Sequence, residues 1–410
     1  MHILFLTHRM PYPPNKGERI RAFHELKHLA ARHEVDVFCL ADSADELKHK
    51  ENLKEICNEV HAARPGKAAR LLRALRSMLS GHPISFGYFQ SSELRRAVHS
   101  ALNHKRYDLI FVNCSSMAQY VPQPAPAPVI VDFVDADSNK FVQYAARSAR
   151  PMSWIHAWEA VTVAKAEREI GRLADLSLVI TAGDAADLGG AGWTGSEIKV
   201  VSSGVEVPPD TSPVDPFVLR QQPFALFLGT MSYLPNADAA QYFAEEIYPI
   251  VRLLNPQLKF VIAGRDPGKR VRKLAQIPGV VVTGAVPDAF EYFRAATVSV
   301  APFRVSQGFQ YKVAESLAVG TPVVATRRVA AGVGLSEREG LFVAETPTEF
   351  AHKVAAIAGD RTLQAELRST STEVRKQLSW DLRVSSLDSC LDQITAKSST
   401  ESTLTSLVGR

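Results

Sequence analysis

The feature that most constrains the fold is an alternation of short apolar runs with amphipathic segments, which occurs twice along the chain. The first copy opens with an apolar run at 2–7, a helical pattern over 18–32 and a second apolar run at 34–40. Short runs that are apolar throughout are typical of strands buried on both faces of a parallel sheet. A strand, a helix and a strand in this order predict a βαβ unit with a right-handed crossover.

Further strands are expected in both halves. They fall at 108–113, 129–134, 176–181 and 198–201 in the first half, and at 224–228, 258–263, 280–283, 297–301 and 322–325 in the second. Helical patterns lie between them, including 236–253 and 310–319. The sequence therefore predicts an α/β protein with two similar, doubly wound halves, and in such open sheets ligands bind outside the carboxyl ends of the strands.

A proline-rich segment separates the two halves. Residues 206–223 hold five prolines among polar residues, a composition typical of a hinge. We therefore expect an amino-terminal domain over 1–205, a hinge over 206–223 and a carboxyl-terminal domain over 224–379. A closing helix is expected over 380–395, followed by a frayed tail over 396–410. The 410 residues suffice for two such domains.

Composition excludes several classes of protein. The net charge of +4 is a mild basic bias and does not indicate a nucleic-acid-binding protein. The four cysteines show no CxxC pair, so we expect reduced thiols and no zinc site. No apolar run approaches the roughly 18 residues that span a bilayer, and the first run is too short for a signal peptide. We expect a cytoplasmic protein, soluble or peripheral on the inner face of the membrane.

The densest chemistry lies at residues 301–324. A strand is expected to end near Pro302, a loop carries Gly308, and a helix follows. Helix amino-termini bind anions, and a glycine lets a phosphate approach the backbone closely. Lys312 and Glu315 share a helix face, so a cation for phosphate and a carboxylate for a diol point the same way. From spacing alone, a solvated Lys–Glu pair on an ordinary helix is the more frequent interpretation of this pattern.

This segment carries a family resemblance. The run 307–309 (Gln-Gly-Phe), with Lys312, Glu315 and 320–324 (Gly-Thr-Pro-Val-Val), resembles the donor motif of retaining group 1 (family 4) glycosyltransferases. Further matches lie at Gly17 and at 203–205, 228–230, 263–264 and 284–286. The stretches 132–138 and 229–236 resemble a narrower subgroup, the sugar transferases associated with exosortase (PEP-CTERM) exopolysaccharide systems.

The resemblance implies a fold and an activity. The fold would be GT-B, with two Rossmann-like domains that face each other across a cleft and a carboxyl-terminal helix that crosses back. The activity would be transfer of a sugar from a nucleotide-diphosphate-sugar donor to a glycan or polyprenyl-linked acceptor, with retention of configuration and without a metal or other cofactor. The setting would be exopolysaccharide or cell-surface polysaccharide biosynthesis.

The resemblance also implies roles for individual residues. Glu315 takes the position of the glutamate that binds the donor ribose, and a carboxylate accepting two hydroxyl donors suits that role. Gln307 stands where the family has its first motif glutamate and would hydrogen-bond the donor sugar. The backbone N–H groups of Gly308 and Phe309 would face the diphosphate. The donor site would also include Gly229, Asn236, Arg265 and Val286.

The cation for the leaving diphosphate departs from the family pattern. The family often places an arginine and a lysine after the first strand of the second domain, and residues 230–236 contain neither. Lys312 is the cation that we expect to take this catalytic role, with Arg304 or Arg265 as the other candidates.

In the first half, Gly17, Arg19 and Arg21 fit the family's loop beneath the donor phosphates and the acceptor. A turn glycine with two exposed arginines is the equally frequent alternative. Asp135 follows the strand at 129–134, where many relatives carry an active-site histidine, and it could orient the acceptor or accept its proton. The sequence of residues 135–137 also spells a DxD metal motif, which we interpret as coincidence in a GT-B chain. Ser115 and Ser116 are expected to line the acceptor pocket.

Residues 62–80 read as a basic amphipathic helix without an acidic residue. Such helices can lie on anionic membranes, so a peripheral contact through 64–79 is one interpretation. A helix packed on its own domain with its basic residues in solvent is the other.

Two other functions stay open. A nucleotide-sugar 2-epimerase of GT-B fold would convert a nucleotide-sugar without any acceptor, and a non-catalytic binder would hold the donor without transfer. A nicotinamide-dependent enzyme is excluded, because the loop after the first strand lacks GxGxxG.

Overall fold

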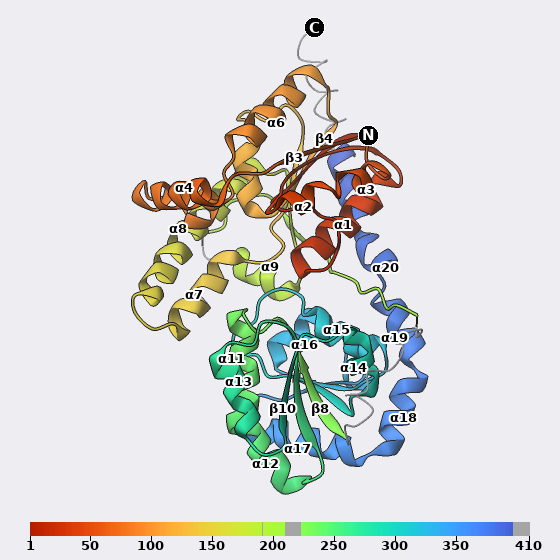
Figure 1. Cartoon of the computed structure of the whole chain (residues 1–410). Helices are drawn as coiled ribbons and strands as arrows, with labels where there is room; N and C mark the ends of the chain where they lie inside the picture. The colour runs from red at the N-terminus through yellow and green to blue at the C-terminus, as the bar shows by residue number, and fades with distance from the viewer. Residues whose placement is uncertain (191, 210–222, 397–410) are drawn as a thin grey trace. The chain divides into compact units, whose positions relative to one another are not determined.

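The computed structural model describes residues 1–190, 192–209 and 223–396 (Figure 1). Most of the predicted hinge at 206–223 and of the predicted tail at 396–410 lies outside these residues. The chain divides into two units, Met1–Ser202 with Val384–Arg410 (unit 1) and Ser203–Arg383 (unit 2). The last described helical residues, 386–396, therefore belong to the same unit as the amino terminus.

Unit 1 is built on a seven-stranded parallel sheet in the order β3-β2-β1-β4-β5-β6-β7. Its strands are β1 (His2–Thr7), β2 (Glu34–Leu40), β3 (Glu59–Ala63), β4 (Leu109–Asn113), β5 (Val129–Asp132), β6 (Leu176–Val179) and β7 (Ile198–Val200). Its helices are α1 (Gly17–Ala30), α2 (Ala44–Leu47), α3 (Lys50–Lys54), α4 (Lys67–Leu79), α5 (Ile84–Tyr88), α6 (Ser92–His104), η1 (Ser115–Tyr120), α7 (Asp137–Arg147), α8 (Met152–Leu173) and α9 (Ala182–Leu188).

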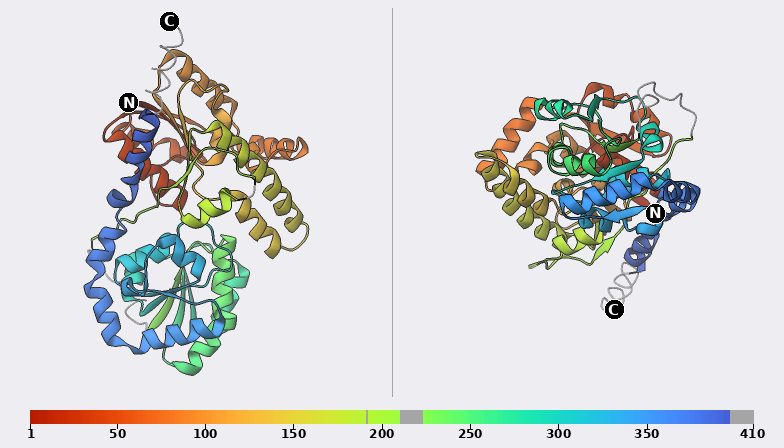
Figure 2. Two further views of the ribbon diagram at one scale, coloured as in Figure 1. Left: turned by 180° about the vertical axis from the view of Figure 1, so that it is seen from behind. Right: turned by 90° about the horizontal axis from the view of Figure 1, so that it is seen from below.

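Unit 2 repeats the plan with six parallel strands in the order β10-β9-β8-β11-β12-β13. Its strands are β8 (Phe224–Leu228), β9 (Lys259–Ala263), β10 (Val280–Gly284), β11 (Val298–Ala301), β12 (Val323–Ala325) and β13 (Leu341–Val343). Its helices are α11 (Leu234–Tyr242), η2 (Phe243–Ile247), α12 (Tyr248–Leu254), α13 (Lys269–Lys273), η3 (Leu274–Gln276), α14 (Ala289–Ala295), α15 (Tyr311–Ala318), α16 (Arg327–Val333), η4 (Glu337–Glu339), α17 (Pro347–Gly359), α18 (Arg361–Ser369), α19 (Ser371–Gln377) and α20 (Trp380–Val384). Helices flank both faces of this sheet (Figure 2).

Apolar burial explains why these segments form strands. The side chains of 3–6 in β1 and of 260–263 in β9 are fully buried, since both strands lie between neighbours and beneath helices. The α/β class, with two parallel sheets and alternating helices, is therefore confirmed.

Two predicted helices differ in detail. The helix expected over 236–253 begins at Leu234 and contains one π-helical turn, Phe243–Ile247, just before Pro249, which lacks the N–H that a regular helix needs. The helix expected over 380–395 is interrupted at Ser385, between α20 and the helical residues 386–396.

Candidate functional site

The candidate site of unit 2 lies where the strand order reverses. The chain passes from β8 outward to β10 and then returns to the other side of β8 with β11. In such sheets the ends of the two central strands diverge, and ligands bind outside their carboxyl ends. Gly229 follows β8, and the loop 302–310 follows β11 and leads into α15. The motif found in the sequence therefore lies at the switch point of the sheet.

Two glycines allow the backbone and side chains to crowd at this point. Gly264 has φ +138°, and a Cβ there would lie 1.8 Å from the carbonyl oxygen of Gly229. A Cβ on Gly229 would lie 2.9 Å from Lys312 Nζ and 2.8 Å from Asn236 Nδ2. Only glycine fits at position 264, because a Cβ would meet the backbone, whereas a larger residue at 229 would displace the side-chain ends of Lys312 and Asn236.

Lys312 is held in one orientation by its surroundings. Its Nζ donates a hydrogen bond of 2.6 Å to Asn236 Oδ1, and Asn236 Nδ2 donates to the carbonyl of Thr230 at 2.9 Å. The ammonium also lies 4.8 Å from the ring centre of Phe303 and 5.0 Å from that of Phe227. Burial lowers the pKa of Lys312 to about 7, and the Glu315 carboxylate offsets part of this effect.

Glu315 lies one turn further along α15. The helix buries Val313 and Leu317 against the sheet and leaves Glu315 half-buried at the border of this apolar face. Burial raises the pKa of Glu315 to about 7, against the lowering effect of Lys312. No residue that the structure describes donates a hydrogen bond to this carboxylate. It is therefore available to accept hydrogen bonds from a ligand.

The loop before α15 has the backbone that a close ligand contact requires. Gly308 has φ +67°, in the left-handed region that favours glycine. Phe309 is buried, with its ring 5.2 Å from that of Tyr311, so only its backbone can face a ligand. Gln307 Oε1 accepts a hydrogen bond of 2.6 Å from the guanidinium of Arg328 on α16, a neighbour that the sequence pattern did not reveal.

The three candidate cations differ in their surroundings. Arg304 is paired with Asp238 at 2.6 Å and with Glu246 at 3.6 Å, so its charge is already compensated. Arg265 is exposed and donates to Thr230 Oγ1 at 3.3 Å. Lys312 alone of the three lies half-buried beside the strand ends, and we retain it as the candidate. Val286, after β10, packs against the apolar cluster of Phe224 and Leu226.

In unit 1 the arginines expected on the acceptor side are part of the interior. Arg21 is 1% exposed and donates to both oxygens of Asp132, at 2.7 and 3.0 Å. Arg19 is 4% exposed and bonds Glu46 at 2.6 Å. The alternative of two exposed arginines is wrong, because α1 turns Arg21 toward the buried Asp132 and Arg19 toward the half-buried Glu46. That the two arginines contact the acceptor stays a prediction. Gly17 begins α1 and stays a candidate.

Asp135 follows β5 in a strained segment. Val134 has φ +69° and Cys114, after β4, has φ +79°, both unusual for residues with a side chain. Burial raises the pKa of Asp135 to about 7, against the lowering effect of Lys140, whose Nζ is 3.9 Å away. Ser115 and Ser116 are 2% and 3% exposed, so they lie within the unit, and their place in an acceptor pocket stays a prediction.

Two further residues were missed from the sequence: Glu167, which lies near Asp135 and Asp137, and His8, which lies near Asp137 and Lys140. Burial lowers the pKa of His8, directly after β1, to about 4, and its buried Nδ1 has no hydrogen-bond partner among the described residues. Burial raises the pKa of Glu167 on α8 to about 7, and this carboxylate accepts from the N–H of Ser138 at 3.1 Å. The position of His8 at the end of the first strand was the signal that could have identified it.

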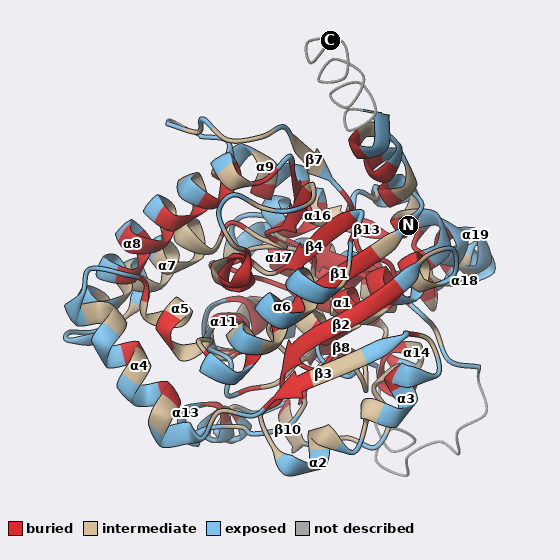
Figure 3. Cartoon of the chain, turned by 90° about the horizontal axis from the view of Figure 1, so that it is seen from above, coloured by how far each residue is buried: buried red, intermediate tan, exposed pale blue. Residues whose placement is uncertain are grey.

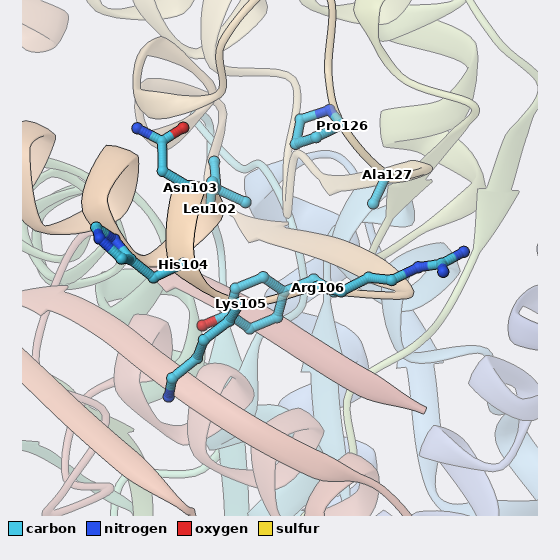
Figure 4. Close-up of a pocket in the computed structure, with 8 residues that line it drawn as sticks. Leu102, Asn103, His104, Lys105, Arg106, Pro126 and Ala127 are labelled. Atoms are coloured by element: carbon cyan, nitrogen blue, oxygen red, sulfur yellow. The ribbon is translucent and has the colours of Figure 1, made fainter.

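A cavity in unit 1 lies at the opposite end of the sheet (Figure 4). It is lined by residues 102–107, which precede β4, and by Pro126 and Ala127, which precede β5. The charge of Lys105 is compensated by Asp36 at 2.9 Å and by Glu59 at 2.8 Å. Because parallel sheets bind ligands at their carboxyl ends, this cavity is not our candidate. Within the described residues, no three His, Cys, Asp or Glu side chains are grouped to hold a metal ion.

Comparison with known proteins defines the class of domain. Residues 222–360 match the family model of the group 1 glycosyl transferases. The fold of the whole chain is similar to that of sucrose-phosphate synthase from Thermosynechococcus elongatus, with a TM-score of 0.68, 16% identity, and coverage of 97% of this chain and 100% of that one. It is also similar to Anabaena HepE in complex with UDP-glucose, with a TM-score of 0.64, 17% identity, and coverage of 96% and 100%.

These findings show that residues 222–360 of unit 2 are similar to the group 1 glycosyl transferases and that the two-domain fold is GT-B. Among curated proteins, the chain is 28% identical to D-inositol 3-phosphate glycosyltransferase of Acidothermus cellulolyticus over 212 residues. This alignment spans 45% of the chain and 45% of that relative.

Proposed function

We propose that the protein transfers a sugar from a nucleotide-diphosphate-sugar to a glycan or a lipid-linked glycan. The observation that carries this proposal is the pair on α15. An available carboxylate, Glu315, and a half-buried ammonium, Lys312, lie at the switch point of a domain that matches the group 1 glycosyl transferases. Together they match the two ends of a nucleoside diphosphate, a diol that donates hydrogen bonds and a phosphate that accepts them.

In the proposed reaction Glu315 binds the ribose hydroxyls, and the N–H groups of Gly308 and Phe309 face the diphosphate. The bond from the sugar to the diphosphate breaks, and negative charge grows on the leaving oxygen. Lys312 stabilises that charge because it is held in place beforehand by Asn236. Gln307, oriented by Arg328, hydrogen-bonds a hydroxyl of the donor sugar.

For the acceptor we propose Asp135 as the proton acceptor or orienting group. Its raised pKa suits a group that takes a proton near neutral pH. We propose that the configuration of the sugar is retained, that no metal or other cofactor takes part, and that the product is an exopolysaccharide or cell-surface polysaccharide of the exosortase-associated kind. A cytoplasmic location agrees with four cysteines that form no disulfide.

The donor is identified by screening the purified chain against a panel of nucleotide-sugars by thermal shift, because a bound ligand raises the apparent stability. We expect one donor to stabilise the protein more than its free nucleoside diphosphate does. NMR of the mixture without acceptor then separates the alternatives. A donor that is converted to a second nucleotide-sugar indicates a 2-epimerase and contradicts the proposal.

Glu315→Gln tests the ribose contact. Gln keeps the shape but loses the charge that strengthens the two accepted hydrogen bonds, so we expect donor affinity to fall by about 1.5–3 kcal/mol. Calorimetry at about pH 8 gives the largest difference between the two proteins, because the carboxylate of wild-type Glu315 is then mostly ionised. Glu373→Gln, an exposed glutamate of α19, is the matched control and should bind as wild type. Equal affinity of Glu315→Gln and wild type would remove Glu315 from the site.

The pH dependence of donor binding follows from the two shifted pKa values. Donor binding is strongest when Lys312 is protonated and Glu315 is ionised, and burial brings the pKa of each group to about 7 in the free protein. Affinity should therefore fall as the pH rises above 7, where Lys312 loses its proton, and as it falls below 7, where Glu315 gains one. Calorimetric titrations across this range should give a bell-shaped curve. Lys312→Met should lose the alkaline limb and Glu315→Gln the acid limb, and a flat wild-type profile would contradict the assignment.

A further inference from the structure

Helix α4 presents its apolar side to the solvent. Leu71, Leu72, Leu75 and Leu79 are 65%, 60%, 50% and 76% exposed, and the residues that α4 buries are Arg70 and Ala74. An amphipathic helix that served only to cover its own domain would have the reverse orientation. The helix predicted over 62–80 exists and is amphipathic. It begins at Lys67, because residues 62–63 are the end of β3.

Polar contacts fix α4 in this orientation. Arg70 donates to Asp42 Oδ1 at 2.6 Å and to the carbonyl of Ala41 at 2.8 Å. Arg73 donates to the carbonyl of Gln90 at 2.8 Å. Arg70, which the sequence pattern placed among the charges facing a membrane, is therefore structural. The leucines face outward because the opposite side of the helix is bonded to the domain.

Helix α8 exposes a second apolar group on the same side of unit 1 (Figures 1 and 3). Trp154, Trp158 and Val161 are 62%, 44% and 70% exposed, and Arg150 stacks on Trp154 with 5.0 Å between guanidinium and ring centre. A carboxylate connects the two helices through α5. Glu159 of α8 accepts from the N–H groups of Ile84 and Ser85 at 2.7 and 2.8 Å, and α5 packs on α4 so closely that only Gly87 fits there.

Within the two segments that carry these groups the charge has one sign, and Glu169 of α8, which lines a pocket together with Arg73 and Arg76, is an acidic neighbour outside them. Residues 60–92 contain five lysines and arginines and no aspartate or glutamate, and residues 141–158 contain two arginines and again no acidic residue. Exposed leucines beside basic side chains, with tryptophans that combine an apolar ring and a polar N–H, are the chemistry of a surface that enters the headgroup region of an anionic bilayer. No helix that the structure describes is long and apolar enough to cross a membrane.

We propose that α4 and the first half of α8 together form a docking surface for an anionic lipid membrane. The leucines and tryptophans enter the interface, and Arg64, Lys67, Arg76 and Arg150 meet the lipid headgroups. This surface is larger than the contact through 64–79 that the sequence indicates, and it does not depend on the proposed sugar transfer.

The test is sedimentation of the purified chain with vesicles of phosphatidylcholine alone or mixed with phosphatidylglycerol. Wild type should sediment with the mixed vesicles and not with the neutral ones, and salt should weaken binding because it screens the charges. The double variants Leu71→Gln/Leu75→Gln and Trp154→Gln/Trp158→Gln should each lower the partition coefficient by about tenfold or more. Leu253→Gln/Leu254→Gln removes two exposed leucines of α12, which are 83% and 47% exposed, and should bind as wild type.

A second set of variants distinguishes binding through this surface from attraction by the net charge of the whole protein. The triple variant Arg64→Gln/Lys67→Gln/Arg76→Gln should lose binding, whereas Lys269→Gln/Arg270→Gln/Arg272→Gln, which removes three exposed charges of α13, should not. Equal loss in both would show that net charge alone drives binding. The proposal would also be overturned if wild type failed to sediment with the mixed vesicles. A wild-type dimer in ultracentrifugation that dissociates in Leu71→Gln/Leu75→Gln would likewise contradict it, because the leucines would then contact a second copy of the chain. Equal thermal midpoints establish that each variant is folded.

Discussion

Replacing Lys312 with methionine is expected to slow sugar transfer by on the order of 10²-fold or more, while donor binding weakens much less. Methionine keeps the aliphatic stem against Phe227 and Phe303 and removes the ammonium. The negative charge on the leaving diphosphate is greater in the transition state than in the bound donor, so the loss falls mainly on the rate. Asn236 already orients the ammonium in the free protein, which makes it a preorganised group.

The measurement is single-turnover transfer from saturating donor at about pH 7, where Lys312 is partly protonated and Glu315 and Asp135 are partly ionised, with donor affinity measured separately by calorimetry. Lys376→Met, an exposed lysine of α19, is the control and should react as wild type. Equal losses of rate and binding in Lys312→Met would make Lys312 a phosphate anchor without a catalytic role. An unchanged rate would assign the leaving-group charge to another cation, of which Arg265 is the exposed candidate.

Replacing Arg21 with methionine is expected to lower the free energy of unfolding of unit 1 by about 3–5 kcal/mol. Arg21 is the cation that faces Asp132 and Glu25 in the interior, and it also donates to the carbonyl of Val201 at 2.7 Å. Burial raises the pKa of Glu25 well above its ordinary value, and Arg21 is the main group that lowers it. Without the guanidinium, buried carboxylates must be neutralised or left unpaired.

Urea denaturation followed by circular dichroism measures this change. Arg32→Met removes an arginine near the end of α1 that is 63% exposed in its side chain and paired with Asp388, so we expect a loss of at most about 1 kcal/mol. The deficit of Arg21→Met should be largest above neutral pH and smaller in acid, since protonation removes the charge of the unpaired carboxylates. A deficit below about 1 kcal/mol at neutral pH would contradict the assignment of Arg21 as the structural cation of unit 1.

The fold was largely predictable because parallel strands buried on both faces leave continuous apolar runs. The two strands that were missed are edge strands. Glu59–Ala63 and Leu341–Val343 each pair on one side only, and they are too short or too polar to stand out as apolar runs. The orientation of α4 could not be predicted either. Its sequence pattern is the same whether the leucines face the core or the solvent, and the contacts of Arg70 decide between the two.

The candidate site was predictable where local sequence determines it. The spacing of Lys312 and Glu315 on α15 and the left-handed backbone of Gly308 follow from nearby residues. The partners of Arg304 and Arg21 do not, because Asp238 and Asp132 lie 66 and 111 residues away in the chain. Whether a basic residue serves a ligand or the interior is therefore decided by tertiary packing.

The most direct test of the central claim follows the sugar itself. The full chain is incubated with the donor identified by thermal shift, labelled in its sugar, and with polyprenyl-linked glycan acceptors, and the lipid-extractable product and the free nucleoside diphosphate are quantified. We expect labelled acceptor and nucleoside diphosphate in equal amounts, an anomeric centre with the configuration of the donor, and loss of both products in Lys312→Met. Donor that binds but yields no nucleoside diphosphate, or that becomes a different nucleotide-sugar without acceptor, would contradict the assignment of this protein as a sugar transferase.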